Sequence, residues 1–536
     1  MLNQFFSSCF SPISTYCFQN STPEPYPSLT NVTCSQEEVY KYLSTHKINT
    51  ASGPDGVSSQ MLRATAGAIT PAITSIFNKS LEQSKVPVDW KISYVTPIPK
   101  SGDLSLVSNY RPISLLSLIS KILERIIHNK ISHFLYSNNL LSNCQFGFRP
   151  QSSTQEALLS VTNSWHQMLT KHHQVVTIFF DVRKAFDSVP HNHLISSIAE
   201  IGISGSLLKW LSDYLTGRKQ QVVLDGITSE SVPVTSGVPQ GSILGPLLFN
   251  IFMNSISNLS FSQNTRLIMY ADDILLYKPV DSIADIQNLQ QDVDLVLSWM
   301  QSHGLTPNIS KTKLMPITRS KSVLPINISI YGNAISHCKS VKYLGVIISS
   351  NLTWSEHITS ICKKTKQHLG LIHRKLYQSP PCVRHQIYRS VILPKLDYCG
   401  AVWNPHHALD IAALENVQKF GGRIITKQWQ CDYPTLLSIL KWKPLSIRRK
   451  IQKLKVCYNI LNKFSIIPPS VFTLHPHPSP RHLHSQILFR PYVSTSAHKF
   501  SFFIDVIPIW NSLPYFIINS PNPFTFKKRV TRYLCF

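Results

Sequence analysis

Hydrophobic and polar residues alternate along the chain in a pattern that predicts a mixture of strands and helices. The clearest strand is the apolar run over residues 175–180, which ends at Asp181. A second apolar stretch, residues 266–277, is interrupted in its middle by two adjacent acids, Asp272 and Asp273. Apolar residues on both sides of such a break predict a hairpin with the acids at its turn.

Apolar residues recur at helical spacing in several longer segments. The first begins after Ser35 and Glu38, which have the spacing of a capping box. Further helices are expected over residues 69–81, 115–134 and 283–303. Another should run from the glycine turn at 145–149 to about residue 169, and a long apolar helix that follows residues 236–246 should end near residue 256. Residues 95–100 indicate a short strand whose two prolines place it at a sheet edge or a loop boundary.

Composition divides the chain into parts of different character. Residues 1–34 are rich in Ser, Pro, Thr and Asn, which favours a linker or frayed end. Residues 351–465 are helical in period and basic. Within them, residues 361–460 hold 18 Lys or Arg against four Asp or Glu, a net +14. Residues 466–536 begin with a Pro- and His-rich stretch and are predicted to be a linker and a C-terminal tail, with metal binding by the histidines as the alternative.

The net charge of the 536-residue chain is +25, which favours a polyanionic partner and nucleic acid first. A merely basic surface is the alternative. In the basic helices, one-signed charge favours contact with a phosphate backbone, because a solvated helix face usually carries both signs. The 11 cysteines form no Cys-x-x-Cys pair, which indicates reduced thiols. The longest apolar run, residues 113–127, is broken by three charges, and no signal peptide is recognisable, so we expect neither a membrane nor a secreted protein.

The adjacent acids suggest metal chemistry. Two like charges at the end of a buried hairpin cost free energy unless a cation compensates them, and hard oxygen ligands favour Mg²⁺. Asp181 supplies a third carboxylate that adjacent strands of one sheet could bring to face Asp272. Such a set suits two-metal nucleotidyl transfer. The alternative is an Asp-Asp turn in a solvated loop.

Collinear motifs carry a family resemblance. Residues 179–187 (FFDVRKAFD), 237–242 (GVPQGS) and 270–273 (YADD) resemble reverse-transcriptase motifs A, B and C in order and spacing. More narrowly, the chain resembles the polymerase of a non-LTR (LINE-type) retrotransposon of the jockey/CR1-like group. Supporting matches lie at residues 51–56, 90–100, 109–114, 145–149, 311–313, 343–345, 401–405 and 510–514. The resemblance extends from about residue 35 to the C-terminus.

The resemblance implies an α+β right-hand polymerase fold with fingers, a palm built on an antiparallel sheet, and a helical thumb. Residues 35–350 would form fingers and palm, 351–465 the basic thumb or connection, and 466–536 the linker and tail. The implied activity is that of an RNA-directed DNA polymerase with two Mg²⁺ ions, for which Mn²⁺ is a substitute. The implied partners are an RNA template, a DNA primer or target and deoxynucleoside triphosphates, in a nuclear or cytoplasmic ribonucleoprotein.

Full-length members of this group carry an endonuclease before the polymerase, and from the resemblance we expect this chain to lack one. The cysteines after Cys338 also lack the knuckle spacing of members with a C-terminal nuclease. We therefore expect the chain to polymerise without nicking its target, and a separate endonuclease to be a partner.

The resemblance also implies roles for individual residues in catalysis and metal binding. Asp181 and Asp272 match the metal-bridging aspartates, and Asp273 matches the second acid of the hairpin. The Val182 carbonyl would complete the ligand set. Lys313 resembles the lysine proposed as general acid to the pyrophosphate, and Lys311 is almost as well placed.

Other positions match the nucleotide and primer sites. Phe186 matches the steric gate that excludes a ribose 2′-hydroxyl, and a plain core Phe is its alternative. Lys100 and Arg111 match the fingers cations that hold the triphosphate. Gln240 and Gly241 match a loop that packs against nucleotide and template. The turn Tyr343-Leu344-Gly345 resembles the primer grip.

Three other functions remain open at this stage. A group II intron maturase shares the Tyr-Ala-Asp-Asp motif, but the matches at 401–405 and 510–514 disfavour it. An RNA-dependent RNA polymerase more often has Gly-Asp-Asp and a gate smaller than Phe186. A catalytically inactive or host-recruited RNA-binding remnant is the alternative from a different class, and the intact acids and fingers cations argue against gross decay.

Overall fold

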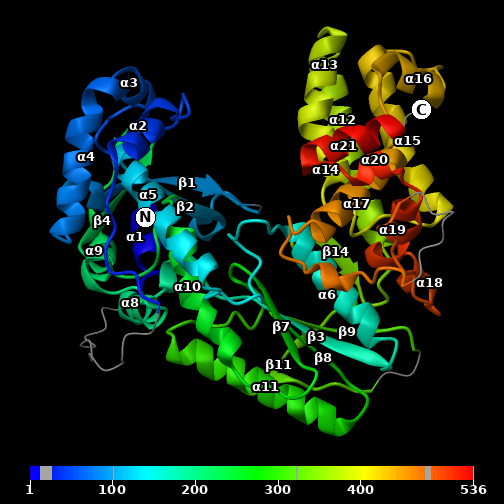
Figure 1. Cartoon of the computed structure of the whole chain (residues 1–536), viewed down its shortest axis with the longest axis horizontal. Coiled ribbons are helices and arrows are strands. Elements are labelled where there is room, and N and C mark those ends of the chain that lie inside the picture. Colours follow the sequence, from blue (N-terminus) through cyan, green and yellow to red (C-terminus); the bar gives the residue numbers. More distant parts are fainter. Residues whose placement is uncertain (12–26, 101, 321–323, 477–483, 535–536) are drawn as a thin grey trace.

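The computed structural model describes residues 1–11, 27–100, 102–320, 324–476 and 484–534 (Figure 1). Helices and antiparallel sheet occur together, which confirms the predicted α+β class. A five-stranded sheet lies at the bottom of the view, with the N-terminal half of the chain on one side and the helices that follow residue 350 on the other.

The central sheet has the strand order β12-β9-β3-β8-β7. Its strands are β3 (Gln174–Phe180), β7 (Arg266–Tyr270), β8 (Asp273–Pro279), β9 (Lys313–Thr318) and β12 (Ser336–His337). The middle strand β3 pairs antiparallel with both β8 and β9, and only β12 is parallel to its neighbour. The predicted strand before Asp181 and the predicted Asp-Asp hairpin are both confirmed.

Every residue of β3 is buried, because both faces of the sheet are covered. Val176 and Ile178 pack into one hydrophobic core, which includes the helix α11 (Ile283–Ser302). Val175 and Phe179 point to the other face and pack into a second core that includes α6 (Thr154–Met168). A strand buried on both faces reads as a continuous apolar run rather than an alternating one.

A second sheet lies in the N-terminal half. Its strands are β1 (Ile92–Pro99), β2 (Tyr110–Leu115), β4 (Arg218–Leu224), β5 (Ile227–Thr228) and β6 (Val232–Val234). The edge position predicted for residues 95–100 is confirmed for the part that holds the prolines, although β1 as a whole lies between β2 and β4. Its pairs with β4 end at Val95, so Pro97 and Pro99 fall where β2 is the only neighbour and no ladder donor is needed on the other side.

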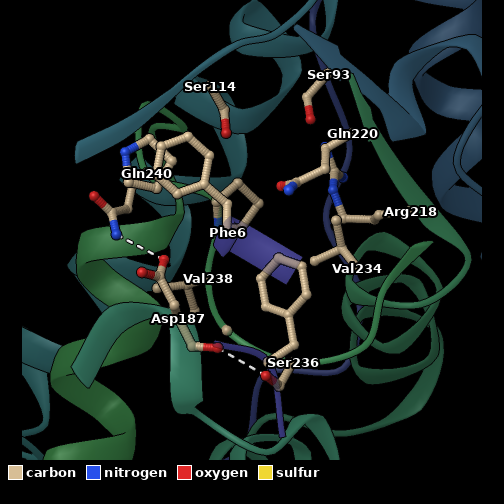
Figure 2. A pocket seen from close by; sticks show the side chains of 14 residues that line it. Phe6, Ser93, Ser114, Asp187, Arg218, Gln220, Val234, Ser236, Val238 and Gln240 are labelled. Carbon is tan, nitrogen blue, oxygen red and sulfur yellow. Dashed lines mark hydrogen bonds between the residues drawn. The ribbon is translucent and has the colours of Figure 1, made fainter. Parts of the chain in front are cut away.

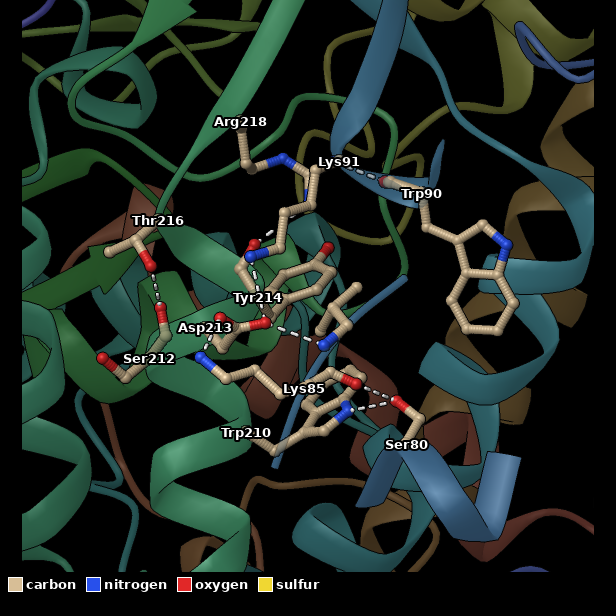
Figure 3. A network of polar contacts seen from close by, with 11 residues as sticks. Ser80, Lys85, Trp90, Lys91, Trp210, Ser212, Asp213, Tyr214, Thr216 and Arg218 are labelled. Atoms are coloured by element: carbon tan, nitrogen blue, oxygen red, sulfur yellow. Dashed lines mark hydrogen bonds and ion pairs between the residues drawn. The ribbon is translucent and has the colours of Figure 1, made fainter. Parts of the chain in front are cut away.

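Figure 3 shows the polar network that anchors the start of β1. Asp213 on α9 (Gly205–Leu215) accepts the backbone N–H of Val86 at 2.7 Å and pairs with Lys91 at 2.9 Å and Lys85 at 3.4 Å. The indole N–H of Trp210 donates to Ser80 Oγ at 3.0 Å. The network ties the chain that enters β1 to α9, and so fixes the strand that leads to Lys100.

The remaining helices of this half surround the two sheets. They are α2 (Gln36–Ser44), α3 (Ser59–Ala64), α4 (Ala66–Glu82), α5 (Leu118–Ser137), α7 (Ala185–Ser188), α8 (His191–Glu200) and α10 (Gly245–Met253). The predicted capping box at Ser35 is present, with both of its hydrogen bonds made.

Residues 2–11, which the sequence assigned to a linker, pack against the second sheet. Helix α1 (Leu2–Ser7) buries Phe6 to 3% exposure, and the Asn3 amide donates to Glu230 O at 2.8 Å. Hydrophobic burial far from the neighbouring sequence holds this short helix, and composition does not register such a contact. Residues 12–26 of the predicted linker lie outside the described residues.

The basic segment forms helices that pack on the second core. They are α12 (Ser355–Lys375), α13 (Pro381–Ile387), α14 (Leu393–Asp397), α15 (Ala408–Thr426), α16 (Tyr433–Leu440) and α17 (Leu445–Leu461). Two short hairpins precede them, β10 (Ser329–Ile330) with β11 (Asn333–Ala334) and β13 (Ser340–Tyr343) with β14 (Val346–Ser349).

The C-terminal segment is more ordered than the predicted tail. It contains α18 (Ser496–Lys499), α19 (Phe502–Asn511), α20 (Tyr515–Ile518) and α21 (Pro523–Tyr533). Trp510, Phe526 and Val530 are fully buried in the second core, so this segment is part of the folded body. Residues 477–483 of the Pro/His-rich stretch lie outside the described residues. In the described ranges, no helix combines the length and apolar character needed to cross a membrane.

Candidate active site

Three acids meet at one end of the central sheet. Asp181 follows the last residue of β3, and Phe180 pairs with Ile274 on β8. Asp273 is the first residue of β8 and pairs with Tyr270, so Asp272 sits in a two-residue turn. The antiparallel register therefore places the end of β3 beside the hairpin turn, as the sequence predicted.

The three carboxylates interact electrostatically. Burial, followed by the charges of Asp272 and Asp181, raises the pKa of Asp273 to about 7. Asp273 is exposed at the start of β8, whereas Asp272 is half-buried. The pKa of Asp272 is also raised, mainly by burial and then by Asp181, whereas Arg111 lowers it. The site thus brings together three carboxylates whose negative charges repel one another.

The donor chemistry of this acid cluster fits a divalent cation. Among the ion pairs of the described residues, none includes Asp181, Asp272 or Asp273, so their mutual repulsion is not neutralised by a side-chain partner. Carboxylate and carbonyl oxygens are the ligands that Mg²⁺ prefers. Over the described ranges, however, no group of three or more His, Cys, Asp or Glu side chains is already arranged to hold a metal ion.

Asn308 and Thr312 hold Asp181 in place, and sequence reasoning missed both. The Asn308 amide donates to Asp181 Oδ2 at 2.8 Å, and its backbone N–H donates to Asp181 O at 2.7 Å. The backbone N–H of Asp181 donates to Thr312 Oγ1 at 3.3 Å. Asn308 follows Pro307 in a short helix-to-strand loop, a position where Asn often bonds the backbone, but its partner lies 127 residues away.

The carbonyl of Val182 is not used in the backbone hydrogen bonds that its neighbours make. Val182 forms an isolated bridge with Pro307, and the two hydrogen bonds around that bridge use the carbonyl of Asp181 and the N–H of Arg183. The Val182 carbonyl takes no part in either bond, which is compatible with the ligand role implied by the resemblance.

Phe186 is half-buried beside the acids and is held by aromatic contacts. Its ring stacks on Phe249 of α10 with centroids 4.2 Å apart and an interplanar angle of 13°. The ring of Phe148 meets it edge-on at 5.9 Å and 86°. The ring is therefore held from two sides while part of its surface stays accessible.

The loop with Gln240 and Gly241 packs against the chain that follows Asp181 (Figure 2). The Gln240 amide donates to Asp187 Oδ1 at 2.6 Å, and the Gln240 carbonyl accepts from Ser114 N at 2.7 Å. Gly241 has φ +126°, and a Cβ there would lie 2.4 Å from Ser114 O, so only glycine fits. The loop thereby joins β2 to the helix that carries Phe186.

The start of α10, directly after this loop, is capped by the fully buried carboxylate of Glu124. Glu124 Oε2 accepts the N–H groups of Ile243 at 2.7 Å and Leu244 at 3.2 Å. Burial raises the pKa of Glu124, and the two N–H groups oppose the shift. This cap fixes where the helix that carries Phe249 begins.

Three cations, Arg111, Lys311 and Lys184, act on Lys100 at the end of the second sheet. Burial lowers the pKa of Lys100, and the charges of Arg111, Lys311 and Lys184 lower it further, whereas Asp187 raises it. Since Arg111 also acts on Asp272, the cation cluster lies across from the acids. Such a group of like charges is electrostatically suited to a polyanion.

Lys313 lies apart from these cations. It is in β9, where its ammonium donates to Ser336 Oγ at 2.8 Å and to Ser310 O at 3.4 Å. The structure therefore brings Lys311, and not Lys313, into electrostatic contact with Lys100. The sequence alone left these two lysines nearly equivalent.

The turn Tyr343-Leu344-Gly345 joins β13 to β14 as a tight hairpin. Leu344 and Gly345 both have positive φ, +45° and +81°, which suits a two-residue hairpin turn. Tyr398 donates to Leu344 O at 3.0 Å and covers the turn. The buried ring of Tyr343 packs edge-on against Phe179 at 5.4 Å, and the charge of Asp273 helps to raise the pKa of Tyr343, so the hairpin lies close to the acids.

Comparison with known proteins gives one family match. Residues 98–348 match the family described as reverse transcriptase (RNA-dependent DNA polymerase). The match runs from the end of β1 into β14 and includes Asp181, Asp272 and Asp273 and the cations around Lys100, so the family signal and the acid cluster fall on the same part of the chain.

Individual relatives agree with this match. The chain is 31% identical over 417 residues to the RNA-directed DNA polymerase from mobile element jockey of Drosophila funebris, covering 74% of this chain and 45% of the relative. The jockey protein of Drosophila melanogaster is 30% identical over 373 residues, 68% of this chain and 40% of the relative. The probable RNA-directed DNA polymerase from transposon BS of Drosophila melanogaster is 27% identical over 410 residues, 74% of this chain and 45% of the relative.

The chain spans less than half the length of these curated relatives. Among solved structures, apo telomerase from Candida tropicalis, truncated from its C-terminal domain, aligns with 14% identity and a TM-score of 0.36 over 57% of this chain and 62% of that chain. This structural likeness is too low to support an argument.

Proposed function

Because residues 98–348 form a reverse transcriptase domain and the chain is homologous to RNA-directed DNA polymerases of non-LTR retrotransposons, we propose that it copies an RNA template into DNA. The substrates would be deoxynucleoside triphosphates and the 3′-hydroxyl of a DNA primer. The observation that supports this most directly is the meeting of Asp181, Asp272 and Asp273 opposite the cations around Lys100.

The cations would bind the triphosphate of the incoming nucleotide. Lys100 and Arg111 come from neighbouring strands of the second sheet, and Lys311 approaches from the loop before β9. An Arg guanidinium can hold phosphate oxygens bidentately, and lysine ammonium groups act as point charges. Lys311 is thus better placed than Lys313 to donate a proton toward a departing pyrophosphate, and we assign that role to Lys311.

Phe186 would lie under the sugar of the same nucleotide. Its ring is stacked on Phe249, so it has no freedom to turn away from an extra oxygen. A carbon-only ring face also offers no donor or acceptor to a 2′-hydroxyl. The Gln240–Gly241 loop, fixed to Asp187 and Ser114, would support the base and template from the other side.

The acids would provide the reaction centre. Asp181, Asp272, Asp273 and the Val182 carbonyl would hold two Mg²⁺ ions, or Mn²⁺ as a substitute, which supply activation of the primer 3′-hydroxyl and neutralisation of the pyrophosphate charge. Asn308 and Thr312 keep the Asp181 backbone and carboxylate in position for this role. Tyr343, Leu344 and Gly345 would set the primer end beside Asp273.

The helices after residue 350 would hold the template–primer duplex. Residues 361–460 carry a net +14, and this excess suits phosphate contacts along a nucleic-acid backbone. In the right-hand description, we assign residues 35–350 to fingers and palm and 351–465 to the thumb, and we propose that the packed helices of 484–534 support the thumb.

Primer extension on an RNA template tests the proposal. The parent chain, with Mg²⁺ and the four dNTPs, is expected to extend a DNA primer, and the Asp272→Ala, Asp273→Ala double variant is expected not to. RNA binding by both proteins, measured in parallel, separates a lost reaction from lost folding. Binding without extension by the parent would favour the RNA-binding remnant instead.

A further inference from the structure

The turn that carries the two hairpin acids is gripped by one buried amide, that of Gln145. Its Oε1 accepts the backbone N–H of Ala271 at 2.9 Å and that of Gly147 at 2.7 Å. Its Nε2 donates to the carbonyl of Ala271 at 3.2 Å. The side chain is 3% exposed, so these bonds are made away from water, where each is worth most.

The backbone around Gln145 runs beside the end of β7 and brings the amide to the turn. Cys144 O accepts from Met269 N at 2.8 Å, and Phe146 N donates to Met269 O at 2.9 Å. A Cβ on Gly147 would lie 2.3 Å from Ala271 N, so glycine is required for this approach. The segment therefore lies against the turn as closely as a neighbouring strand.

The segment is itself anchored to a rigid helix. Asn250 of α10, which is 2% exposed, donates from Nδ2 to Gly147 O at 2.8 Å. The same helix carries Phe249, on which Phe186 stacks. The Gln145 segment thus links the acid turn to the element that fixes the gate.

The turn needs such support. Ala271 has φ +56°, in the left-handed region that non-glycine residues adopt at a cost of ~1–3 kcal/mol. The next two residues are carboxylates that repel each other and Asp181. The backbone strain at Ala271 and the repulsion among the carboxylates both favour relaxation of the turn. The Gln145 amide opposes this relaxation by binding the N–H and the carbonyl of Ala271.

We propose that Gln145 is a positioning residue, which holds the Ala271–Asp272 turn so that Asp272 and Asp273 are presented to a divalent cation. This proposal deepens the proposed function and rests on it. A side-chain amide meets the requirement, because its oxygen accepts two N–H groups while its NH2 group donates to the carbonyl of Ala271. A carboxylate would keep the acceptor, lose the donor and add a buried negative charge beside the acids.

A matched pair of variants tests the role. Gln145→Met keeps the length and removes the hydrogen bonds. Gln174→Met makes the same substitution at the first residue of β3, the end away from Asp181, where the residue is 2% exposed and its amide has no hydrogen-bond partner among the described residues. A general effect of losing a buried amide would appear in both variants. An effect of releasing the Ala271–Asp272 turn would appear only in Gln145→Met.

The first readout is Mn²⁺ binding to the full chain, followed by the electron paramagnetic resonance of free Mn²⁺. Loss of a group that orients metal ligands typically weakens affinity about 10- to 100-fold. We expect a weakening of that order in Gln145→Met and parent-like affinity in Gln174→Met. This measurement does not require polymerase activity, so it tests the clamp even if the proposed function fails.

The second readout is single-nucleotide extension, in which kcat should fall about tenfold or more in Gln145→Met while the KM for dNTP stays near that of Gln174→Met. The thermal midpoint of Gln145→Met should be lower than that of Gln174→Met, because only the first change leaves buried backbone groups without their partner, so both readouts are taken well below the two midpoints. Equal Mn²⁺ affinity and equal kcat in the two variants would overturn the proposal. A parent chain that binds no Mn²⁺ would overturn it as well, whereas Mn²⁺ binding without extension would count against the proposed function alone.

Discussion

Replacing Phe186 by valine tests how the protein distinguishes sugars. The phenyl ring is held on one face by Phe249, with centroids 4.2 Å apart, and at its edge by Phe148. Valine leaves an apolar side chain at the position but removes the ring face that would lie under the sugar. The change should therefore open space for one hydroxyl group without altering the acids or the cations.

The expected magnitudes come from these contacts. The lost aromatic pairing is worth ~0.5–1.5 kcal/mol. Because Phe186 is only half-buried, the total loss of stability should stay below the ~3–5 kcal/mol of a fully buried Phe→Ala change. For substrate choice, one extra small group in a packed pocket is worth ~1–3 kcal/mol, or about 10- to 200-fold. The preference for dNTP over NTP should fall by at least about tenfold.

The assay is single-nucleotide extension with dCTP and CTP, reported as the ratio of the two kcat/KM values. Phe148→Leu is the control, because it changes a residue that touches the same ring but is 48% exposed and lies at the edge. We expect its ratio to stay near that of the parent. If Phe186→Val used dCTP normally and kept the parent ratio, Phe186 would not be the gate and the placement of the sugar over this ring would be wrong.

Three further predictions concern charge. A proton competes with the cation for Asp273, whose pKa is raised to about 7, so the Mg²⁺ concentration for half-maximal extension should rise as pH falls from 8 to 6; a flat requirement would contradict this. Burial and then the charges of His498 and Arg319 lower the pKa of His166 to about 3. Below pH 6.5, His166 therefore binds a proton in the unfolded chain but stays neutral in the folded chain. The free energy of unfolding should therefore drop by ~2 kcal/mol at pH 5, and urea titrations should show a smaller drop in His166→Gln. Lys311→Ala should raise the KM for dNTP about two- to fivefold, the effect of losing an exposed charge, and should lower kcat because Lys311 is assigned proton donation to the pyrophosphate, whereas Lys313→Ala should leave both values unchanged. The reverse result would return the general-acid role to Lys313.

The elements that carry the acids were predictable because their signals are local. β3 is an uninterrupted apolar run, since both of its faces are buried, and the hairpin around Asp272 is a break between two such runs. The capping box at Ser35 also depends only on residues three apart. Short-range patterns of this kind survive in the fold because no distant contact opposes them.

The supports of the site could not be predicted, because each depends on a partner far along the chain. The Gln145 amide forms hydrogen bonds with Ala271, which lies 126 residues away in sequence, and the Asn308 amide donates to Asp181, which lies 127 residues away. Lys311 and Lys313 are separated by one residue in sequence, and only the entry of the chain into β9 assigns them to different surroundings.

Long-range contacts also explain the other differences. The prolines of β1 indicated a sheet edge, which holds for the residues around them, but β4 pairs with the residues before them. The C-terminal segment resembled a tail because its composition changes at a Pro/His-rich stretch, yet Trp510 and Phe526 are buried against the preceding helices. Composition reports what a segment contains and not which surface it covers.

The central claim is that Asp181, Asp272 and Asp273 carry out RNA-templated DNA synthesis. The most direct measurement is rapid-quench incorporation of one dNTP by preformed complexes of protein, RNA template and DNA primer, with parent and Asp181→Asn compared at equal occupancy. We predict that the parent extends the primer and that Asp181→Asn binds the complex with parent-like affinity but extends it at least about a thousandfold more slowly, a barrier increase of ~4 kcal/mol. Extension by Asp181→Asn at the parent rate would contradict the account.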